Sequence, residues 1–353
     1  MTQLFTPFES RSVRIKNRIM MSPMCMYSAK DGFANDFHLM HLGARAAGGV
    51  GLVMVEATAV HPSGRISPGD LGIWSDDHIA PLSKITALIK SFGCVPGIQI
   101  AHAGRNASCH VPWEGGKALT SEEQAWTVFG PTEQPYSEEY AIPKAMSAQD
   151  IQNTVDDFAK AAQRAQKAGF EIIEIHAAHG YLIHTFLSPI SNTRTDTYGG
   201  SFENRTRFLR EIVHAIRSKW PEELPLWTRL SCTDWIDGGW TPEDSVALAK
   251  ILKPGIDLID CSSAGLDPRQ RVHRKPLFQS PFAAQVKAEA EIPTVAVGWI
   301  TTPEEADLLV AEEKADIIAL GRTLLRHPFW ALEAAKTLGQ KPEWIPQYGW
   351  VLT

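Results

Sequence analysis

The feature that most constrains the fold is an eightfold repetition, in which a short apolar, β-branched run is followed each time by a helical pattern. The runs occupy residues 19–23, 51–56, 96–101, 171–176, 226–231, 257–262, 293–298 and 316–321. This alternation is typical of parallel βαβ units. Near-continuous apolarity, as in residues 172–175, fits strands that are covered on both faces. Eight such units predict an α/β fold, a single closed (β/α)8 TIM barrel.

The helices of this barrel have start signals of their own. Ser147 is expected to cap a helix whose apolar residues recur at helical spacing and which Gly169 ends. Thr241-Pro242 and Thr302-Pro303 open two later helices with a capping hydroxyl and a proline at the first helical position. A chain of 353 residues lies within the range of barrels with insertions, so we predict one domain over residues 1–353.

Two segments depart from the alternation. Residues 103–144 have no convincing periodicity and are rich in proline and glycine, and long irregular loops in compact domains are usually functional or disordered. Because this segment follows the third strand, we expect a lid over the mouth of the barrel. Residues 340–353 form an aromatic tail, which is expected either to seal the barrel or to reach a neighbouring subunit.

The charge balance excludes several kinds of partner. The chain has 34 basic and 40 acidic residues, and its formal net charge of −6 argues against nucleic acid or an anionic membrane surface. No apolar run approaches the roughly 18 residues of a membrane span, and the N-terminal residues lack the order of a signal peptide. We therefore expect a cytoplasmic protein. The five scattered cysteines include no Cys-x-x-Cys pair, which disfavours a disulfide framework or a thiolate cluster.

In a parallel barrel, the carboxyl ends of the strands open onto the active-site face. Reading only these ends assembles a candidate site from all eight strands. Its members are Ser22, Pro23, Met24, Cys25, Tyr27, Glu56, Ala57, Thr58, Gln99, His102, His176, His179, Tyr181, Arg229, Ser262, Ser263, Gly298, Trp299, Gly321 and Arg322.

The fourth strand ends in three rings within six residues, His176, His179 and Tyr181, which favours a ligand site over structural histidines. The two histidines could also bind a metal. His38 and His41 have the same spacing, on a helix. Neither pair lies in a His-Glu-x-x-His motif, and no motif supplies a third ligand, so a metal is not favoured. We expect His38 and His41 to pack their helix.

Arg229 interrupts an otherwise buried strand with a permanent charge, which needs an anionic partner. That partner is either a structural carboxylate, Glu56 or Glu174, or a ligand. Gly298 and Gly321-Arg322 follow the seventh and eighth strands, where barrels frequently bind phosphate. A phosphorylated cofactor is therefore expected, and these residues alone do not identify it.

Three stretches taken together resemble the Old Yellow Enzyme family of flavin-dependent ene-reductases, in the branch typified by YqjM and xenobiotic reductase A. They are residues 22–27 (Ser-Pro-Met-Cys-Met-Tyr), residues 176–182 (His-Ala-Ala-His-Gly-Tyr-Leu) and residues 192–205, which run from Asn-Thr-Arg-Thr-Asp to Phe-Glu-Asn-Arg. The resemblance extends over nearly the whole chain.

The resemblance implies a barrel that holds non-covalent FMN, which NADPH or NADH reduces and an activated alkene reoxidises. The flavin contacts carried over to this chain are Ser22, Pro23, Met24, Cys25, Ala57, Gln99, Arg229, Gly298, Trp299, Gly321 and Arg322. Arg229 would face the flavin N1/O2 edge, Gln99 the pyrimidine ring, and Gly321-Arg322 the phosphate.

The resemblance also assigns the chemistry. His176 and His179 would donate hydrogen bonds to the oxygen of an α,β-unsaturated carbonyl, and Tyr181 would protonate the α carbon. Cys25 would lie beside the flavin and tune its potential, or else be an inert thiol. Tyr27 would line the substrate pocket.

The tail departs from part of this branch. Some relatives have an arginine between the tail tyrosine and tryptophan that enters a neighbouring site, whereas Tyr348-Gly349-Trp350 has only glycine. Trp350 is then the candidate to fill that space in a homodimer or homotetramer.

Three competing functions remain open from the sequence. Dienoyl-CoA reductases share this fold, but they have an additional cysteine cluster, which is absent here. A metal-dependent hydrolase would use His176 and His179 as ligands. A non-catalytic flavin redox sensor would use the same barrel without turnover.

Overall fold

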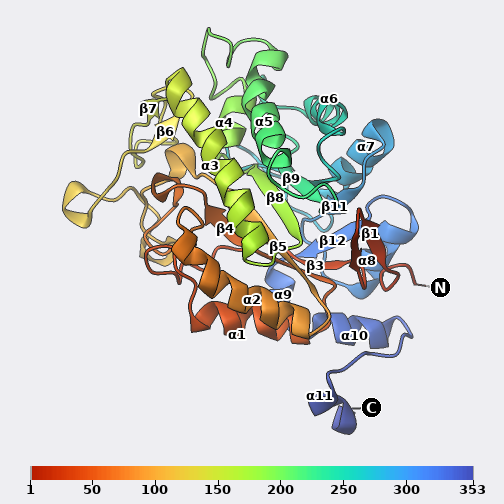
Figure 1. The fold of residues 1–353 in the computed structure, drawn as a ribbon. Coiled ribbons are helices and arrows are strands. Elements are labelled where there is room, and N and C mark those ends of the chain that lie inside the picture. The colour runs from red at the N-terminus through yellow and green to blue at the C-terminus, as the bar shows by residue number, and fades with distance from the viewer. Residues whose placement is uncertain (1, 353) are drawn as a thin grey trace.

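The computed structural model describes residues 2–352 and contains a closed eight-stranded parallel barrel (Figure 1). All eight predicted strands are confirmed. They are β3 (Ile19–Met21), β4 (Leu52–Ala59), β5 (Val95–Ala101), β8 (Ile172–Ala177), β9 (Leu226–Ser231), β10 (Leu258–Ser262), β11 (Thr294–Ala296) and β12 (Ile317–Leu320). Neighbouring strands pair in sequence order, and β12 pairs with β3 to close the barrel.

Helices cover the outside of the barrel. The longer ones are α1 (Asp36–Ala47), α2 (Ile79–Ser91), α3 (Ala148–Lys167), α5 (Phe202–Arg217), α6 (Pro242–Leu252), α7 (Ser280–Ala290), α8 (Pro303–Ala311) and α10 (Trp330–Thr337). Short helices α4 (Leu182–Leu187) and α9 (Arg322–Arg326) follow β8 and β12. The expected caps are confirmed: the side chains of Ser147, Thr241 and Thr302 accept hydrogen bonds from backbone N–H groups of the first turns of α3, α6 and α8.

The barrel interior is apolar near the amino-terminal ends of the strands, and an N-terminal hairpin closes the barrel at this end. Its side chains include Met20, Leu52, Trp227 and Leu258, and they pack in one cluster with residues of an N-terminal hairpin. This hairpin consists of β1 (Phe8–Ser10) and β2 (Val13–Ile15). The hairpin forms the floor of the barrel, so that polar groups toward the carboxyl ends of the strands face only the opposite opening.

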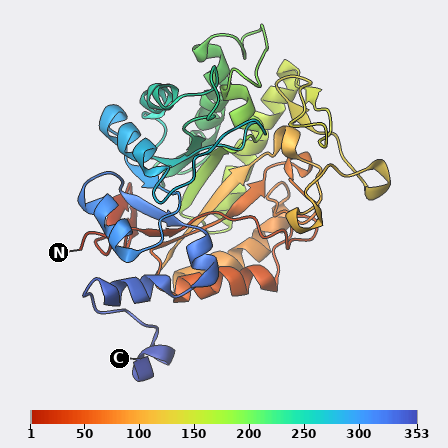
Figure 2. The ribbon, with the colours of Figure 1, turned by 180° about the vertical axis from the view of Figure 1, so that it is seen from behind.

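The segment expected to form a lid is mostly irregular, as predicted. It contains the 3-10 turns η3 (Gly104–Asn106), η4 (Pro112–Glu114) and η5 (Ser121–Glu123), and the two-residue strands β6 (Phe129–Gly130) and β7 (Lys144–Ala145) pair with each other. Figures 1 and 2 show this segment and the N-terminal hairpin at opposite ends of the barrel. The lid therefore lies on the side where the strands end.

The tail ends in a short helix, α11 (Pro346–Leu352), away from the barrel mouth (Figures 1 and 2). Phe329 packs against Trp344 and Tyr348 with ring centroids 6.0 and 5.8 Å apart. Of the two expectations for the tail, sealing the barrel is wrong, because the N-terminal hairpin closes the floor. Among residues 2–352, no helix is both long and apolar enough to cross a membrane.

Candidate active site

The three rings after β8 lie together, as expected. The ring centroid of His176 is 5.1 Å from that of His179 and 4.9 Å from that of Tyr181. The backbone turns sharply between them, because His179 and Gly180 both have positive φ angles, 59° and 75°. At Gly180, a Cβ would lie 2.1 Å from the carbonyl oxygen of Gly265, so only glycine fits this turn.

A buried pair that the sequence did not reveal supports this turn. His184 Nδ1 accepts a hydrogen bond from the Gly180 N–H (2.9 Å), and His184 Nε2 lies 3.0 Å from Asp234 Oδ1. Asp234 also accepts from Ser188 and from the Trp240 N–H. Since Nδ1 is the acceptor, the neutral ring carries its proton on Nε2 and donates to Asp234. The sequence signal that could have revealed this pair is the position of His184, four residues after Gly180 on the following helix.

Hydrogen bonds also fix both site histidines. The Ala178 N–H points to His176 Nδ1 at 3.4 Å, which leaves the proton of a neutral ring on Nε2. The His179 N–H donates to Ser231 Oγ (2.9 Å), and its Nε2 lies 2.7 Å from Ser262 Oγ. Ser262 was expected at the site, whereas the support from Ser231 was not foreseen.

The site rings are neutral. Burial lowers the pKa values of His176 and His179 well below the ordinary value, and the Arg229 charge lowers them further. Burial raises the pKa of Tyr181 well above its ordinary value, and nearby Cys25 adds to the effect. The rings therefore offer neutral hydrogen-bond donors and a phenol that keeps its proton.

The loop after β3 places Cys25 beside the backbone of Ala57. Burial, Asp70 and Glu56 raise the pKa of the Cys25 thiol, which therefore stays protonated. Glu56 holds this loop by accepting a hydrogen bond from the Met26 N–H (2.8 Å). A thiolate nucleophile is thus not favoured at Cys25.

Tyr27 and Met24 complete this side of the site. Tyr27 has a φ of 51°, and its ring packs edge-on against Trp113 of the lid at 5.9 Å. The sulfur of Met24 lies 3.5 Å from the position that a Cβ on Gly321 would occupy, so the loops after β3 and β12 adjoin. Ser22 connects the same two strands through its N–H, which donates to the Leu320 carbonyl at 3.1 Å.

Arg229 is buried, but its ion-pair partner differs from both carboxylates named from the sequence. Its Nε lies 3.2 Å from Asp260 Oδ2, on the neighbouring strand β10, and neither Glu56 nor Glu174 forms the pair. The expectation was wrong because an aspartate at the level of Arg229 on the adjacent strand is closer than either glutamate. Among residues 2–352, Arg229 makes this ion pair through Nε and no hydrogen bond through its Nη groups, which are left as donors for a ligand.

The loops after β11 and β12 line a cavity of about 370 Å³, which contains the four residues expected there, Gly298, Trp299, Gly321 and Arg322. Gly298 has a φ of 120°. Arg326 also lines the cavity, although nothing in the sequence singled it out. Two arginines and backbone groups near glycines suit a phosphate.

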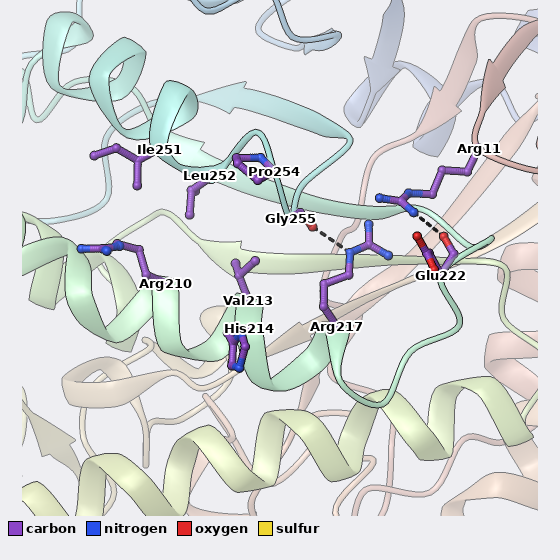
Figure 3. A pocket seen from close by; sticks show the side chains of 10 residues that line it. All are labelled: Arg11, Arg210, Val213, His214, Arg217, Glu222, Ile251, Leu252, Pro254 and Gly255. Carbon is purple, nitrogen blue, oxygen red and sulfur yellow. Dashed lines mark hydrogen bonds between the residues drawn. The ribbon is translucent and has the colours of Figure 1, made fainter.

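A second, larger cavity of about 550 Å³ lies outside the barrel, between α5 and the end of α6 (Figure 3). Two of its three arginines are already occupied. Arg11 donates to the Glu222 carbonyl, Arg217 to the Gly255 carbonyl, and both form ion pairs with Asp257. The third, Arg210, also lines the cavity.

The remaining expected residues divide into three groups. Gln99 lies in the barrel interior, where it donates to Glu174 Oε1 at 2.7 Å. His38 and His41 are buried on α1, as expected, and His38 Nε2 lies 3.4 Å from Glu56 Oε1. Trp350 is not part of the site of its own chain, because it lies on α11 with 80% of its surface exposed. Within residues 2–352, no three His, Cys, Asp or Glu side chains converge as metal ligands.

A closed barrel with a phosphate-type cavity at its last two strands, a buried arginine and a neutral ring cluster is typical of the flavin-binding oxidoreductase barrels. A model of the NADH:flavin oxidoreductase / NADH oxidase family matches residues 3–341, and the chain belongs to this family. The resemblance to Old Yellow Enzymes is confirmed. The protein is an oxidoreductase whose cofactors are FMN and NAD(P)H.

The chain is similar to characterised relatives over its full length. It is 48% identical to an NADPH dehydrogenase of Geobacillus thermodenitrificans and 46% identical to one of Bacillus subtilis, in each case over 99% of both chains. The solved structure of an Old Yellow Enzyme homologue from Zymomonas mobilis matches with a TM-score of 0.79 and 25% identity, over 98% of this chain and 95% of that one.

Proposed function

We propose that the protein is an ene-reductase, which reduces the C=C bond of α,β-unsaturated carbonyls and other activated alkenes with electrons from NADPH or NADH. The observation that carries this proposal is the neutral cluster of His176, His179 and Tyr181 at the mouth of a barrel with the buried Arg229 guanidinium, which pairs with Asp260 through Nε alone. When bound, FMN supplies the hydride from N5.

FMN fits the described residues. The cavity at Gly298, Trp299, Gly321 and Arg322 suits its phosphate, and the Arg229 guanidinium, which pairs with Asp260 through Nε, would offer its Nη donors to the N1/O2 edge. On this proposal, Gln99 adds a donor near the pyrimidine ring, while Ser22, Pro23, Met24, Cys25 and Ala57 line the other side of the cofactor.

His176 and His179 position the substrate. His176 Nε2–H donates to the carbonyl oxygen, and a Ser262 hydroxyl that donates to His179 Nε2 leaves His179 Nδ1–H as the second donor. Two hydrogen bonds to this oxygen draw electron density from the alkene and stabilise the charge that develops there. Tyr27 lines the same pocket.

Tyr181 acts as the general acid that protonates the α carbon. Its ring lies against His176, so a carbonyl bound by the histidines places its alkene next to the phenol. Burial keeps the phenol protonated at neutral pH. Cys25, as a neutral thiol, contributes through its contact with the cofactor and not as a nucleophile.

Anaerobic stopped-flow experiments test this function. NADPH should reduce the bound flavin, and cyclohexenone or a maleimide should reoxidise it in a second, separate phase. A redox sensor would bind flavin without turnover, whereas a metal hydrolase would be colourless and would bind zinc. Only rapid reoxidation by the alkene supports the ene-reductase.

We further propose that the protein is a cytoplasmic homodimer or homotetramer in which α11 contacts another copy near its active site. Tyr348, Trp350, Val351 and Leu352 are all exposed on α11, which is unusual for such large apolar side chains on one short helix. A second copy would cover them.

A further inference from the structure

Two acids face each other inside the barrel, directly beneath the proposed cofactor site. Glu174 on β8 and Asp260 on β10 are both 0% exposed, and β9 with Arg229 lies between their strands. Asp260 is level with Arg229 in the strand register, and Glu174 lies two residues before His176 on the same face of β8. The two carboxyl groups are close enough for the charge of Asp260 to raise the pKa of Glu174.

If both acids are ionised, this cluster has more hydrogen-bond acceptors than donors. Gln99 satisfies Glu174 Oε1, and Arg229 Nε lies 3.2 Å from Asp260 Oδ2, whereas Glu174 Oε2 and Asp260 Oδ1 have no donor among residues 2–352. Two buried carboxylates and one guanidinium would leave a net negative charge in the barrel. A buried pair of like charges in contact cannot both ionise without a large free-energy cost. One proton between the two acids removes both the charge and the repulsion.

We propose that Glu174 and Asp260 share one proton, and that this proton sets the charge with which Arg229 meets the cofactor. The second half of the proposal rests on the proposed function, because it requires FMN above Arg229. Neither acid touches substrate, so both are positioning residues that act through Arg229.

Among the groups around Glu174 and Asp260, only this pair of acids is expected to gain or lose a proton near neutral pH. Arg229 on β9 is permanently charged, and Gln99 on β5 does not titrate. His176 on β8 and His179 in the turn are held neutral by burial. Cys261, the neighbour of Asp260, is a buried thiol with a raised pKa, and Trp227 and Leu258 below are apolar.

The pH dependence has a definite sign. Burial raises the pKa values of both acids, so the pair retains its proton above the range in which free carboxyls lose theirs. With the proton, the cluster is neutral overall. Without it, the cluster carries one negative charge, which opposes negative charge at the N1/O2 edge of the reduced cofactor. Loss of the proton at higher pH should therefore lower the flavin midpoint potential.

Infrared spectroscopy of the apoprotein tests the shared proton without any cofactor. Wild type at pH 7 should show the carbonyl stretch of a buried protonated carboxyl that Glu174→Gln lacks, because the glutamine amide can donate to Asp260 in place of the proton. Burial also raises the pKa of Asp70 to about 7, so its band should appear equally in both proteins and cancel in their difference spectrum. The matched control is Glu171→Gln, which removes the same charge just before the same strand, where Glu171 pairs with Lys90. This control should keep the band.

Absence of a carboxyl band from the difference spectrum of wild type minus Glu174→Gln would overturn the shared proton. If Glu174→Gln does not fold, Asp260→Asn provides the same test, since its amide can donate to Glu174.

The potential of the FMN-loaded enzyme tests the coupling. Between pH 6 and 9, the midpoint potential of wild type should fall up to about 30 mV per pH unit more steeply than that of Glu174→Gln, which corresponds to one additional proton per two electrons. Glu171→Gln should follow wild type. Equal slopes in wild type and Glu174→Gln would overturn the coupling. Failure to bind FMN would overturn the proposed function, and the infrared result would still decide the shared proton.

Discussion

At the scale of single residues, the candidate site consists of groups that burial keeps neutral. His176, His179, Tyr181 and Cys25 all titrate away from physiological pH, in the direction that favours the uncharged form. An uncharged donor can lie next to Arg229 without repulsion, and an uncharged phenol has a proton to give. Neutral donors suit an enone oxygen, whose negative charge appears only as the reaction proceeds.

Tyr181→Phe should separate the two half-reactions. Loss of a general acid typically costs a factor of about 10² to 10⁴, so reoxidation of the flavin by cyclohexenone should slow by at least about 100-fold. Reduction by NADPH should change little, because no proton from Tyr181 is needed there. Stopped-flow absorbance measures both rates.

The control for this variant is Tyr198→Phe, which removes a phenol that donates to Glu211 outside the site. Both rates should remain near wild type. Equal slowing of both half-reactions in Tyr181→Phe would contradict the role of Tyr181 as proton donor.

The sequence revealed those site residues that are polar or charged where the surrounding strand is apolar. Arg229 was predicted because a permanent charge interrupts an apolar strand. Asp260 interrupts its strand in the same way, yet its pairing with Arg229 depends on which strands are neighbours and at what level, which is known only from the register. The supports from His184 and Ser231 likewise act through contacts that are distant in sequence.

At the scale of elements, the loop after β11 depends on a backbone conformation that only glycine adopts readily. Gly298 has a φ of 120°, and a Cβ there would meet Gln279 atoms at 2.8 Å. Gly298→Ala should weaken FMN binding by about 10-fold or more, about 1.4 kcal/mol, because the loop must shift at the phosphate cavity. Fluorescence titration of the apoprotein with FMN measures this loss.

Gly339→Ala is the matched control, because Gly339 also has a positive φ (70°), but a Cβ at this position would have nothing within 4 Å. Both variants should lose about 1–3 kcal/mol of folding stability from backbone strain. Only Gly298→Ala should lose FMN affinity, and equal affinities in the two variants would show that the loop conformation does not matter for the cofactor.

The helices and strands were predictable because the periodic pattern of apolar residues that defines each one lies within a short stretch of sequence. The eight strands and the caps at Ser147, Thr241 and Thr302 were all found at the expected places. The path of the lid was not predictable. Residues such as Trp126, whose indole N–H donates to the Ser63 carbonyl, hold it through single distant contacts that leave no repeat in the sequence.

At the scale of the whole molecule, buried neutral histidines make stability depend on pH. Burial lowers the pKa of His102 to about 3, against an ordinary value near 6.5. Below pH 6.5 the unfolded chain binds a proton that the folded chain does not, so stability falls as the pH falls from 6.5 toward 3. Each such histidine costs about 1.4 kcal/mol per pH unit in this window.

His102→Gln should therefore flatten the pH dependence of stability. Between pH 7 and pH 5, wild type should lose about 2 kcal/mol more than this variant in urea unfolding experiments. The exposed His273 offers the comparison, and His273→Gln should keep the wild-type dependence. A variant at His102 that loses stability in parallel with wild type would refute the contribution.

The tail tests the assembly of the molecule. Removal of residues 346–353 should reduce the mass measured by light scattering toward that of one chain, because α11 exposes four large apolar side chains that a second copy would cover. Trp350→Ala should weaken association in the same direction, and Gln347→Ala on the same helix should not. An unchanged mass after truncation would place the interface elsewhere. The sequence could name this tail as aromatic, but what covers it depends on another chain.

The hairpin that closes the floor of the barrel has a kinetic consequence. With Phe8, Val13 and Ile15 packed against the interior core, the floor of the barrel is closed, and the site opens only toward the carboxyl ends of the strands. If the protein is an ene-reductase as proposed, the nicotinamide donor and the alkene share this opening, and we expect each to leave before the other enters. Initial-rate plots should consist of parallel lines, and excess alkene should inhibit by competing with NADPH for the oxidised enzyme.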